Sequence, residues 1–325
     1  MADDLVVRPF RPDADEGAVL ELLQASLGWV PDELYAAFFR WKHVENPFGR
    51  SGAWVAESGG RLAGFRTFLR WEWDVPGRGV VTAVRAVDTA THPDFQGRGV
   101  FSRLTLHALE ELEGEGVGFV FNTPNDKSRP GYLKMGWRLV AKLPVWARPR
   151  SVLTAAKLLG AAVPAEKWSL DAAGGHPALD VLGDDAATAR LLATLPSSQG
   201  AATHRTAAFL KWRYGFPALH YRAALAGSTV EDGVVLYRLR RRGGAIEAAV
   251  CDLLVPGGDA GVTRSLLRTV VRGSGADYAV RLAGHGPRAA WLPVPGQGPT
   301  FVWRHVTEQA PPPRWDLALG DIELF

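Results

Sequence analysis

The chain has 325 residues, of which 47% are hydrophobic and 22% are charged. This composition is typical of a folded globular protein, and the length allows two domains of ordinary size. The formal net charge of +3 is small for this length, which argues against a dedicated nucleic-acid-binding surface and hence against DNA as a partner.

Cysteine usage and apolar stretches bear on location. The single cysteine, Cys251, excludes an internal disulfide and fits a reducing compartment. The start of the chain is acidic and lacks the apolar segment of a signal peptide. The longest apolar stretch, residues 153–165, is broken by Lys157, Gly160 and Pro164. We therefore expect a cytoplasmic protein that does not bind a membrane.

The first 91 residues predict a sheet with helices on both sides. A strand over residues 5–9 precedes two helices, over 13–27 and 31–44. Pro31 suits a first helical turn, and Asn46-Pro47 closes the second helix. The last predicted elements are a hairpin, with strands over 53–56 and 62–73 about the turn Ser58-Gly59-Gly60, and a strand over 80–91.

A glycine-bearing turn follows that strand, in the run Thr91-His92-Pro93-Asp94-Phe95-Gln96-Gly97-Arg98-Gly99-Val100-Phe101. Two glycines allow positive φ angles and a close approach of the backbone to a ligand. The first amides of the following helix point at that ligand with the positive end of the helix dipole behind them. The turn is therefore a candidate diphosphate site, although many such turns are purely structural.

The elements after the turn complete a βαβαβ order. Residues 100–115 carry apolar side chains at near-helical spacing, and residues 117–121 predict a buried strand that stops at Asn122-Thr123-Pro124-Asn125. A second short helix over 128–135 and the turn Gly136-Trp137 lead into another strand.

This region resembles the GNAT superfamily of acyl-CoA-dependent N-acyltransferases. Its signature is an Arg/Gln-x-x-Gly-x-Gly/Ala loop between a strand and a helix, followed by a strand, an Asn-x-x-Ala element and a Tyr-x-x-x-Gly-Phe/Trp corner. Gln96 to Gly99 match the loop, although Phe101 replaces the usual glycine or alanine. Asn125, Ser128, which stands in for the alanine, and Tyr132, which precedes Gly136-Trp137, match the later positions. The resemblance covers roughly residues 5–148, and we expect an acyl-CoA-binding catalytic domain over 1–148.

The resemblance implies that an acceptor amine attacks the thioester of an acyl-CoA directly, with acetyl-CoA as the expected co-substrate and no metal. The amides of Gln96 to Val100, with Arg98, would hold the diphosphate. A backbone amide near Thr89–Thr91 would stabilise the oxyanion, and Tyr132 would protonate the departing thiolate. The predicted cofactor-binding residues are Thr89, Ala90, Thr91, Gln96, Gly97, Arg98, Gly99, Val100, Phe101, Asn122, Asn125 and Ser128.

The base that deprotonates the amine has three candidates. Asp88 lies in an otherwise apolar strand beside the loop, where a carboxylate needs a reason. His92 titrates in a useful pH range but directly precedes Pro93, so it also suits a turn. We rank Asp88 above His92, and removal of the proton by water is the third option.

Two other assignments have structural alternatives. Tyr132 also fits a core tyrosine whose hydroxyl has a partner. Asn122 and Asn125 are expected to orient pantetheine or the acceptor, but an asparagine in the place of Asn125 more commonly caps the following helix.

The second half repeats the element order of the first. We expect a partly helical connector over 149–200 and a degenerate GNAT-like domain over 201–325. Leu210 and Trp212 align with Phe39 and Trp41. The equivalent loop, Pro256 to Gly261, carries Asp259, which would repel a diphosphate unless it only caps the helix. The expected fold is thus α/β, with two GNAT-like domains that each have a mixed sheet flanked by helices.

We therefore predict an N-acetyltransferase that acts on the primary amine of a small molecule or peptide. One alternative takes the acyl group from a carrier protein or an aminoacyl-tRNA, which would require a basic docking patch near Arg148, Arg150 or Arg238–Arg242. The other is a non-catalytic sensor that binds CoA.

Overall fold

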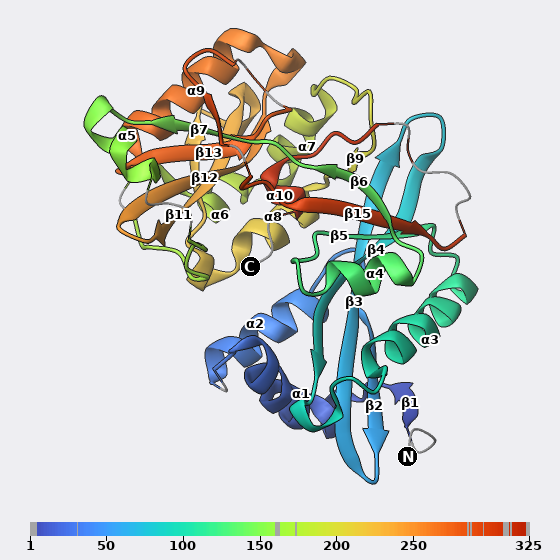
Figure 1. The fold of residues 1–325 in the computed structure, drawn as a ribbon. Helices are drawn as coiled ribbons and strands as arrows, with labels where there is room; N and C mark the ends of the chain where they lie inside the picture. Colours follow the sequence, from blue (N-terminus) through green and yellow to red (C-terminus); the bar gives the residue numbers. More distant parts are fainter. Residues whose placement is uncertain are drawn as a thin grey trace. The chain divides into compact units, whose positions relative to one another are not determined.

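The computed structural model describes residues 5–30, 32–159, 163–172, 174–284, 286, 288–294, 296–307, 312 and 314–322. The chain forms two compact units, Met1–Ala141 with Thr300–Pro311 and Lys142–Pro299 with Pro312–Phe325. Each contains a mixed sheet with flanking helices (Figure 1), which confirms the predicted fold class.

The first unit contains the long hairpin, the glycine-bearing turn and the helices around them. Its elements are β1 (Val6–Pro9), α1 (Pro12–Leu27), α2 (Glu33–His43), β2 (Gly52–Ser58), β3 (Arg61–Val75), β4 (Gly79–Thr91), the 3-10 turn η1 (Pro93–Phe95), α3 (Val100–Gly114), β5 (Phe119–Asn122), α4 (Arg129–Lys134), β6 (Arg138–Lys142) and β15 (Thr300–His305). The strand order is β1-β2-β3-β4-β5-β15-β6. In Figure 1, α1 and α2 lie on one side of the long strands, and α3 and α4 lie on the other.

The packing of α3 requires a glycine in β3. Val100 and Leu104 of α3 are buried in one apolar cluster with residues of β3, β4 and β5. A Cβ atom on Gly64 would lie 2.5 Å from Cγ1 of Val100 and 3.0 Å from Cδ1 of Leu104. The start of α3, and with it the turn that precedes it, is thus held close against the sheet.

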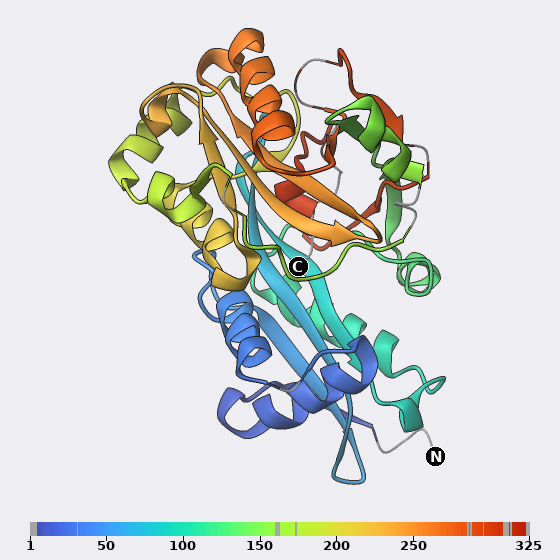
Figure 2. The same ribbon diagram turned by 90° about the vertical axis from the view of Figure 1, so that its left-hand side faces the viewer.

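The second unit has a seven-stranded sheet in the order β14-β7-β13-β12-β11-β10-β8. Its elements are β7 (Val145–Pro149), α5 (Val152–Leu159), β8 (His176–Pro177), α6 (Ala178–Leu182), α7 (Asp185–Ala193), β9 (Ala202–Thr203), α8 (Ala207–Gly215), η2 (Pro217–Leu219), β10 (Arg222–Leu225), η3 (Val230–Asp232), β11 (Val234–Arg242), β12 (Ala245–Leu254), η4 (Pro256–Gly258), α9 (Ala260–Gly273), β13 (Tyr278–Leu282), β14 (Leu292–Val294) and α10 (Leu319–Ile322). Helix α9 packs on this sheet in a second apolar cluster, and Figure 2 shows α6–α8 away from α9, on the other side of the strands.

The units divide the chain differently from the predicted domains 1–148, 149–200 and 201–325. Strand β7, within the predicted first domain, pairs antiparallel with β13 of the second unit. Strand β15, from the predicted second domain, pairs antiparallel with β5 of the first. The predicted connector lies in the second unit and contributes α5, β8, α6 and α7. Helix α5 ends at Leu159, and residues 160–162 of the predicted connector lie outside the described residues.

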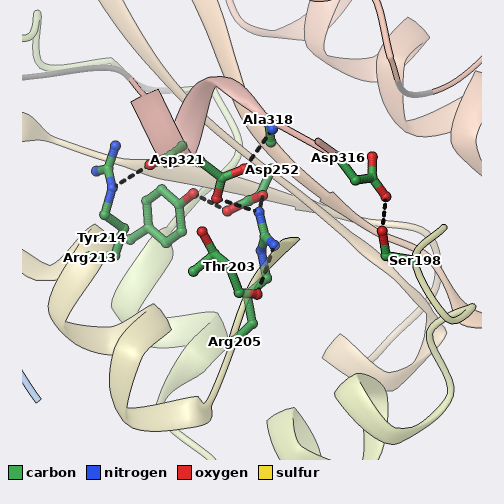
Figure 3. Close-up of polar contacts among 10 residues, drawn as sticks. Ser198, Thr203, Arg205, Arg213, Tyr214, Asp252, Asp316, Ala318 and Asp321 are labelled. Carbon is green, nitrogen blue, oxygen red and sulfur yellow. Dashed lines mark hydrogen bonds and ion pairs between the residues drawn. The ribbon is translucent and has the colours of Figure 1, made fainter. Parts of the chain in front are cut away.

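The last described segment of the chain joins the second unit through a buried polar network (Figure 3). Arg205 donates from Nη2 to Asp252, at 2.7 Å, and to Asp321, at 2.8 Å. Arg213 of α8 donates to the carbonyl oxygen of Gly320 at 2.9 Å. Each of these charges has a polar partner, which offsets part of the cost of burying it. Within the described ranges, no helix is both long and apolar enough to cross a bilayer.

Candidate functional site

The turn before α3 exposes backbone amides. Gly97 and Gly99 have φ angles of +74° and +75°, and residues 96–99 are exposed. Gly99 caps α3 without a side-chain hydrogen bond, and the first helical turn contains no acid. Within the part of the chain that the structure describes, the amides of residues 97–101 donate to no other group. The turn therefore has the free donors and the helix dipole that a phosphate group needs.

The side chains around this turn support its shape. The guanidinium of Arg98 lies 5.2 Å from the ring centroid of Phe95, and that of Arg61 lies 5.4 Å from the same ring. His92 accepts a hydrogen bond at Nδ1 from the amide of Asp94 at 3.2 Å and so caps η1. Gln96 is exposed and adds a polar side chain to the rim of the turn. His92 therefore stabilises the turn by accepting a hydrogen bond at Nδ1, and this nitrogen is not free to act as a base.

Strands β4 and β5 separate just before the turn. They pair in parallel only from Ala83↔Phe119 to Arg85↔Phe121. The register of β4 against β3 shifts between Phe65 and Thr67, which leaves one extra residue in β4 at Asp88–Thr89. A bulge bends a strand and re-aims its groups. The predicted oxyanion donors, Thr89 to Thr91, lie in this part of β4, beyond the last β5 pair.

Tyr132 of α4 lies with its hydroxyl group beside the bulge. Its oxygen accepts a hydrogen bond from Nη1 of Arg66 at 2.7 Å, and the same nitrogen contacts Oγ1 of Thr89. The Tyr132 ring packs edge to face against Phe101, with the ring centroids 5.2 Å apart, and in a tilted arrangement against Trp137 at 5.0 Å. The loop residue Phe101 thus turns toward the protein interior. Because the Tyr132 oxygen accepts from Arg66, its hydrogen is free to donate elsewhere.

The two asparagines after β4 differ in their surroundings. Asn125 accepts at Oδ1 from the amides of Lys127, at 3.1 Å, and Ser128, at 2.9 Å. It therefore holds the turn before α4, which is the capping alternative considered above. Asn122, at the end of β5, is buried, and its Oδ1 has no hydrogen-bond partner among the described residues. Asn122 is thus the asparagine whose side-chain oxygen is available to accept a hydrogen bond from a ligand.

Asp88 is already paired. Its Oδ2 lies 2.6 Å from Nζ of Lys42 and 2.9 Å from Nε2 of His43. Nδ1 of His43 in turn lies 2.9 Å from the hydroxyl oxygen of Ser51. Burial alone would raise the pKa of Asp88, but Lys42 and His43 outweigh it and hold this pKa well below its usual range. The arrangement does not favour Asp88 as a base, because a carboxylate with so low a pKa takes up protons poorly.

Sequence reasoning did not find Lys42, His43 or Arg66. Lys42 and His43 lie in the last turn of α2, where basic residues are common for dipole reasons alone. Arg66 lies in an apolar strand with 0% of its surface exposed. The sequence signal for Arg66 was a charged residue inside an otherwise apolar strand. The same signal made Asp88 a candidate.

The equivalent loop of the second unit is occupied by the protein itself. The amide of Gly257 donates to Thr194 and that of Gly258 donates to Val255. Asp259 caps α9 by accepting from the amide of Val262 at 2.8 Å. The amides of Gly257, Gly258 and Val262 are therefore already used within the protein. The described residues of the chain contain no group of three or more His, Cys, Asp or Glu side chains that could hold a metal ion.

The first unit matches the sequence profile of a known protein family. The family profile described as "Acetyltransferase (GNAT) domain" matches residues 7–140. A comparison with curated proteins finds no match.

Solved structures share the fold of both units. A probable N-acyltransferase from Enterococcus faecalis is 12% identical, with a TM-score of 0.63 over 94% of this chain and 73% of that one. A GCN5-related N-acetyltransferase from Anabaena variabilis is 13% identical, with a TM-score of 0.64 over 93% and 73%. One from Kribbella flavida is 18% identical, with a TM-score of 0.64 over 94% and 72%. At these identities the likeness establishes the fold.

Proposed function

We propose that residues 7–140, which match the profile of the GNAT acetyltransferase domain, form an acetyltransferase that transfers the acetyl group of acetyl-CoA to the primary amine of a small molecule or peptide. The observation that carries the proposal is the set of unused amides at residues 97–101, in an exposed turn at the start of α3. A diphosphate needs this combination of convergent donors and a helix N-terminus.

The binding residues follow from that turn. The amides of Gly97 to Phe101 would hold the diphosphate. The side chain of Arg98 would add a positive charge, which the backbone amides alone do not carry. Strand β4 beyond Arg85, which lacks a β5 partner in the described register, would bind the pantetheine amides with its own backbone groups. Asn122 would add its free side-chain oxygen.

When bound, acetyl-CoA supplies the thioester carbonyl that the amine attacks. A carbon–nitrogen bond forms, the carbon–sulfur bond breaks, and the amine loses one proton while the sulfur gains one. An amide in the Thr89–Thr91 segment would stabilise the charge on the carbonyl oxygen. Tyr132 would give its hydroxyl proton to the sulfur and regain one from water, because its oxygen is held by Arg66 and its hydrogen has no acceptor among the described residues.

The proton from the amine goes to water in this proposal. Asp88 is neutralised by Lys42 at 2.6 Å, and His92 uses Nδ1 to cap η1. Neither side chain is arranged to take a proton, so the third option of the sequence analysis is the one that the contacts support.

The second unit would act as a degenerate copy without a CoA site of its own. The support is its loop, where Asp259 and the carbonyls of Thr194 and Val255 take the amides that a diphosphate would need. Its role would be to complete the fold or to shape the acceptor side.

A carrier-bound acyl donor is the second candidate. Arg148 of β7 lies near Arg268 and Arg272 of α9, and burial together with these two charges lowers the pKa of Arg148. None of the three has an ion-pair partner among the described residues. In the other predicted patch, by contrast, Arg240 and Arg242 bind Glu247.

Calorimetry with acetyl-CoA, followed by a thiol-release assay against a panel of amines, tests the proposal. We expect binding and amine-dependent release of CoA. Binding without turnover on any amine would favour the sensor, and absence of binding would overturn the proposal. Turnover that needs an acylated carrier, and that is lost in Arg268→Glu, would favour the second candidate.

A further inference from the structure

Arg66 is a buried cation whose described partners are all neutral. The side chain is fully buried, and no carboxylate pairs with it among the described residues. Its guanidinium carbon lies 4.4 Å from the ring centroid of Phe68, 5.3 Å from that of Tyr132 and 5.6 Å from that of Phe101. Ring faces and hydroxyl oxygens compensate a positive charge only in part.

The hydrogen bonds of Arg66 are incomplete as well. Nη1 contacts both Tyr132 and Thr89, whereas Nε and Nη2 are buried without a partner among the described residues. In the second unit, by contrast, the largely buried Arg205 binds two carboxylates, those of Asp252 and Asp321 (Figure 3). An unpaired buried charge destabilises a fold, so Arg66 needs a reason other than stability.

The place of Arg66 supplies that reason. One nitrogen holds Thr89, in the segment proposed to stabilise the carbonyl oxygen, and Tyr132, the proposed proton donor. Negative charge develops at both positions only during the reaction. A fixed cation with no counter-ion in the resting protein is therefore stabilised more in the transition state than in the ground state.

We propose that Arg66 is a positioning residue, which orients the Tyr132 hydroxyl toward the sulfur and stabilises the departing CoA thiolate through that hydroxyl. The inference rests on the proposed acetyl transfer. It requires no new reactant, because the proton on the sulfur still comes from Tyr132.

The test measures the bound thiol directly. CoA is bound to the wild type, Arg66→Met, Arg66→Lys and Tyr132→Phe, and the ultraviolet absorbance of its thiolate is followed as a function of pH. We expect the bound thiol of the wild type to titrate at lower pH than that of free CoA. Arg66→Met and Tyr132→Phe should lose this shift, and Arg66→Lys should keep part of it because it keeps the charge.

Two further readouts separate this role from a structural one. Arg66→Met should melt at or above the wild-type temperature, since an apolar side chain replaces an unpaired buried charge. Its kcat should fall about a hundredfold with little change in the KM for acetyl-CoA. Arg66→Lys keeps the proposal testable if Arg66→Met does not fold.

Equal thiol titration in the wild type and Arg66→Met would overturn the inference but leave the transferase proposal intact. So would a large loss of melting temperature in Arg66→Met together with an unchanged thiol shift in Arg66→Lys and Tyr132→Phe. Failure of the wild type to bind CoA would overturn both proposals.

Discussion

Nε2 of His43 lies 2.9 Å from the carboxylate of Asp88, and the second unit repeats this contact with Tyr214 and Asp252. When Trp41 is aligned with Trp212, His43 aligns with Tyr214. Tyr214 donates its hydroxyl hydrogen to Asp252, just as His43 contacts Asp88. Both acids lie at a β-bulge shortly before the loop. In the second loop, the amides of Gly257, Gly258 and Val262 donate to protein groups, so the shared contact indicates a structural role in both units.

Asp88→Asn should therefore lower the free energy of unfolding and leave the chemical step unaffected. Removal of one partner from a buried ion pair costs about 3–5 kcal/mol, because the other charge remains buried. We expect a large loss in the free energy of unfolding, with an unchanged pH–rate profile at temperatures where the variant is folded. Chemical denaturation and steady-state kinetics measure the two effects.

Asp252→Asn in the second unit is the matched control, and it should show a comparable loss of stability. If Asp88→Asn melts like the wild type yet has lost turnover, Asp88 acts in the reaction after all.

His43 predicts a pH dependence of stability. Burial lowers its pKa, although Asp88 opposes the shift and Lys42 adds to it. A folded-state pKa below the unfolded value of about 6.5 means that the unfolded chain binds the proton first as the pH falls. Stability should be complete above about pH 6.5 and decrease below it.

His43→Gln should flatten this decrease in urea titrations between about pH 5 and 7. The half-buried His107, which pairs with Glu111 at 2.9 Å, provides the control variant His107→Gln. An equal slope in the wild type and His43→Gln would contradict the argument.

Local patterns were sufficient to predict the turn but not the strand partners. The helix, the hairpin and the glycines around Gly97 follow from neighbouring residues, and the structure places them as expected. The pairing of β15 with β5 and of β7 with β13 depends on segments far apart in the sequence. No periodicity within β15 specifies which sheet it joins, and for the same reason the partner of Asp88 could not be predicted.

Gly99 gives a direct test of the phosphate turn. Its φ angle is +75° and a Cβ atom would meet nothing within 4 Å, so Gly99→Ala strains the backbone without a clash. We expect CoA affinity to fall about tenfold, since charge-assisted hydrogen bonds from several amides would lose their alignment.

The control for this variant is Gly59→Ala in the turn between β2 and β3. Gly59 has a φ angle of +57° and equally open surroundings, so the backbone cost is similar. Calorimetry should show wild-type CoA affinity for Gly59→Ala; equal weakening by both substitutions would point to general destabilisation.

The second loop predicts a binding stoichiometry. The amides of Gly257 and Gly258 are engaged by carbonyl oxygens, and Asp259 lies where a phosphate would meet a like charge. Calorimetry should therefore give one CoA per chain. Two sites, or binding that persists unchanged in Gly99→Ala, would mean that the second unit binds CoA as well.

Tyr132 and Tyr221 form a matched pair for testing proton donation. Each oxygen accepts a hydrogen bond from a buried arginine at 2.7 Å, from Arg66 in one unit and Arg213 in the other. Tyr132→Phe keeps the packing with Phe101 and Trp137, so CoA affinity should change little while kcat falls about a hundredfold. Tyr221→Phe should lose about as much stability as Tyr132→Phe, but it should keep the turnover of the wild type. Undiminished turnover in Tyr132→Phe would remove this hydroxyl from the mechanism and leave water as the source of the sulfur's proton.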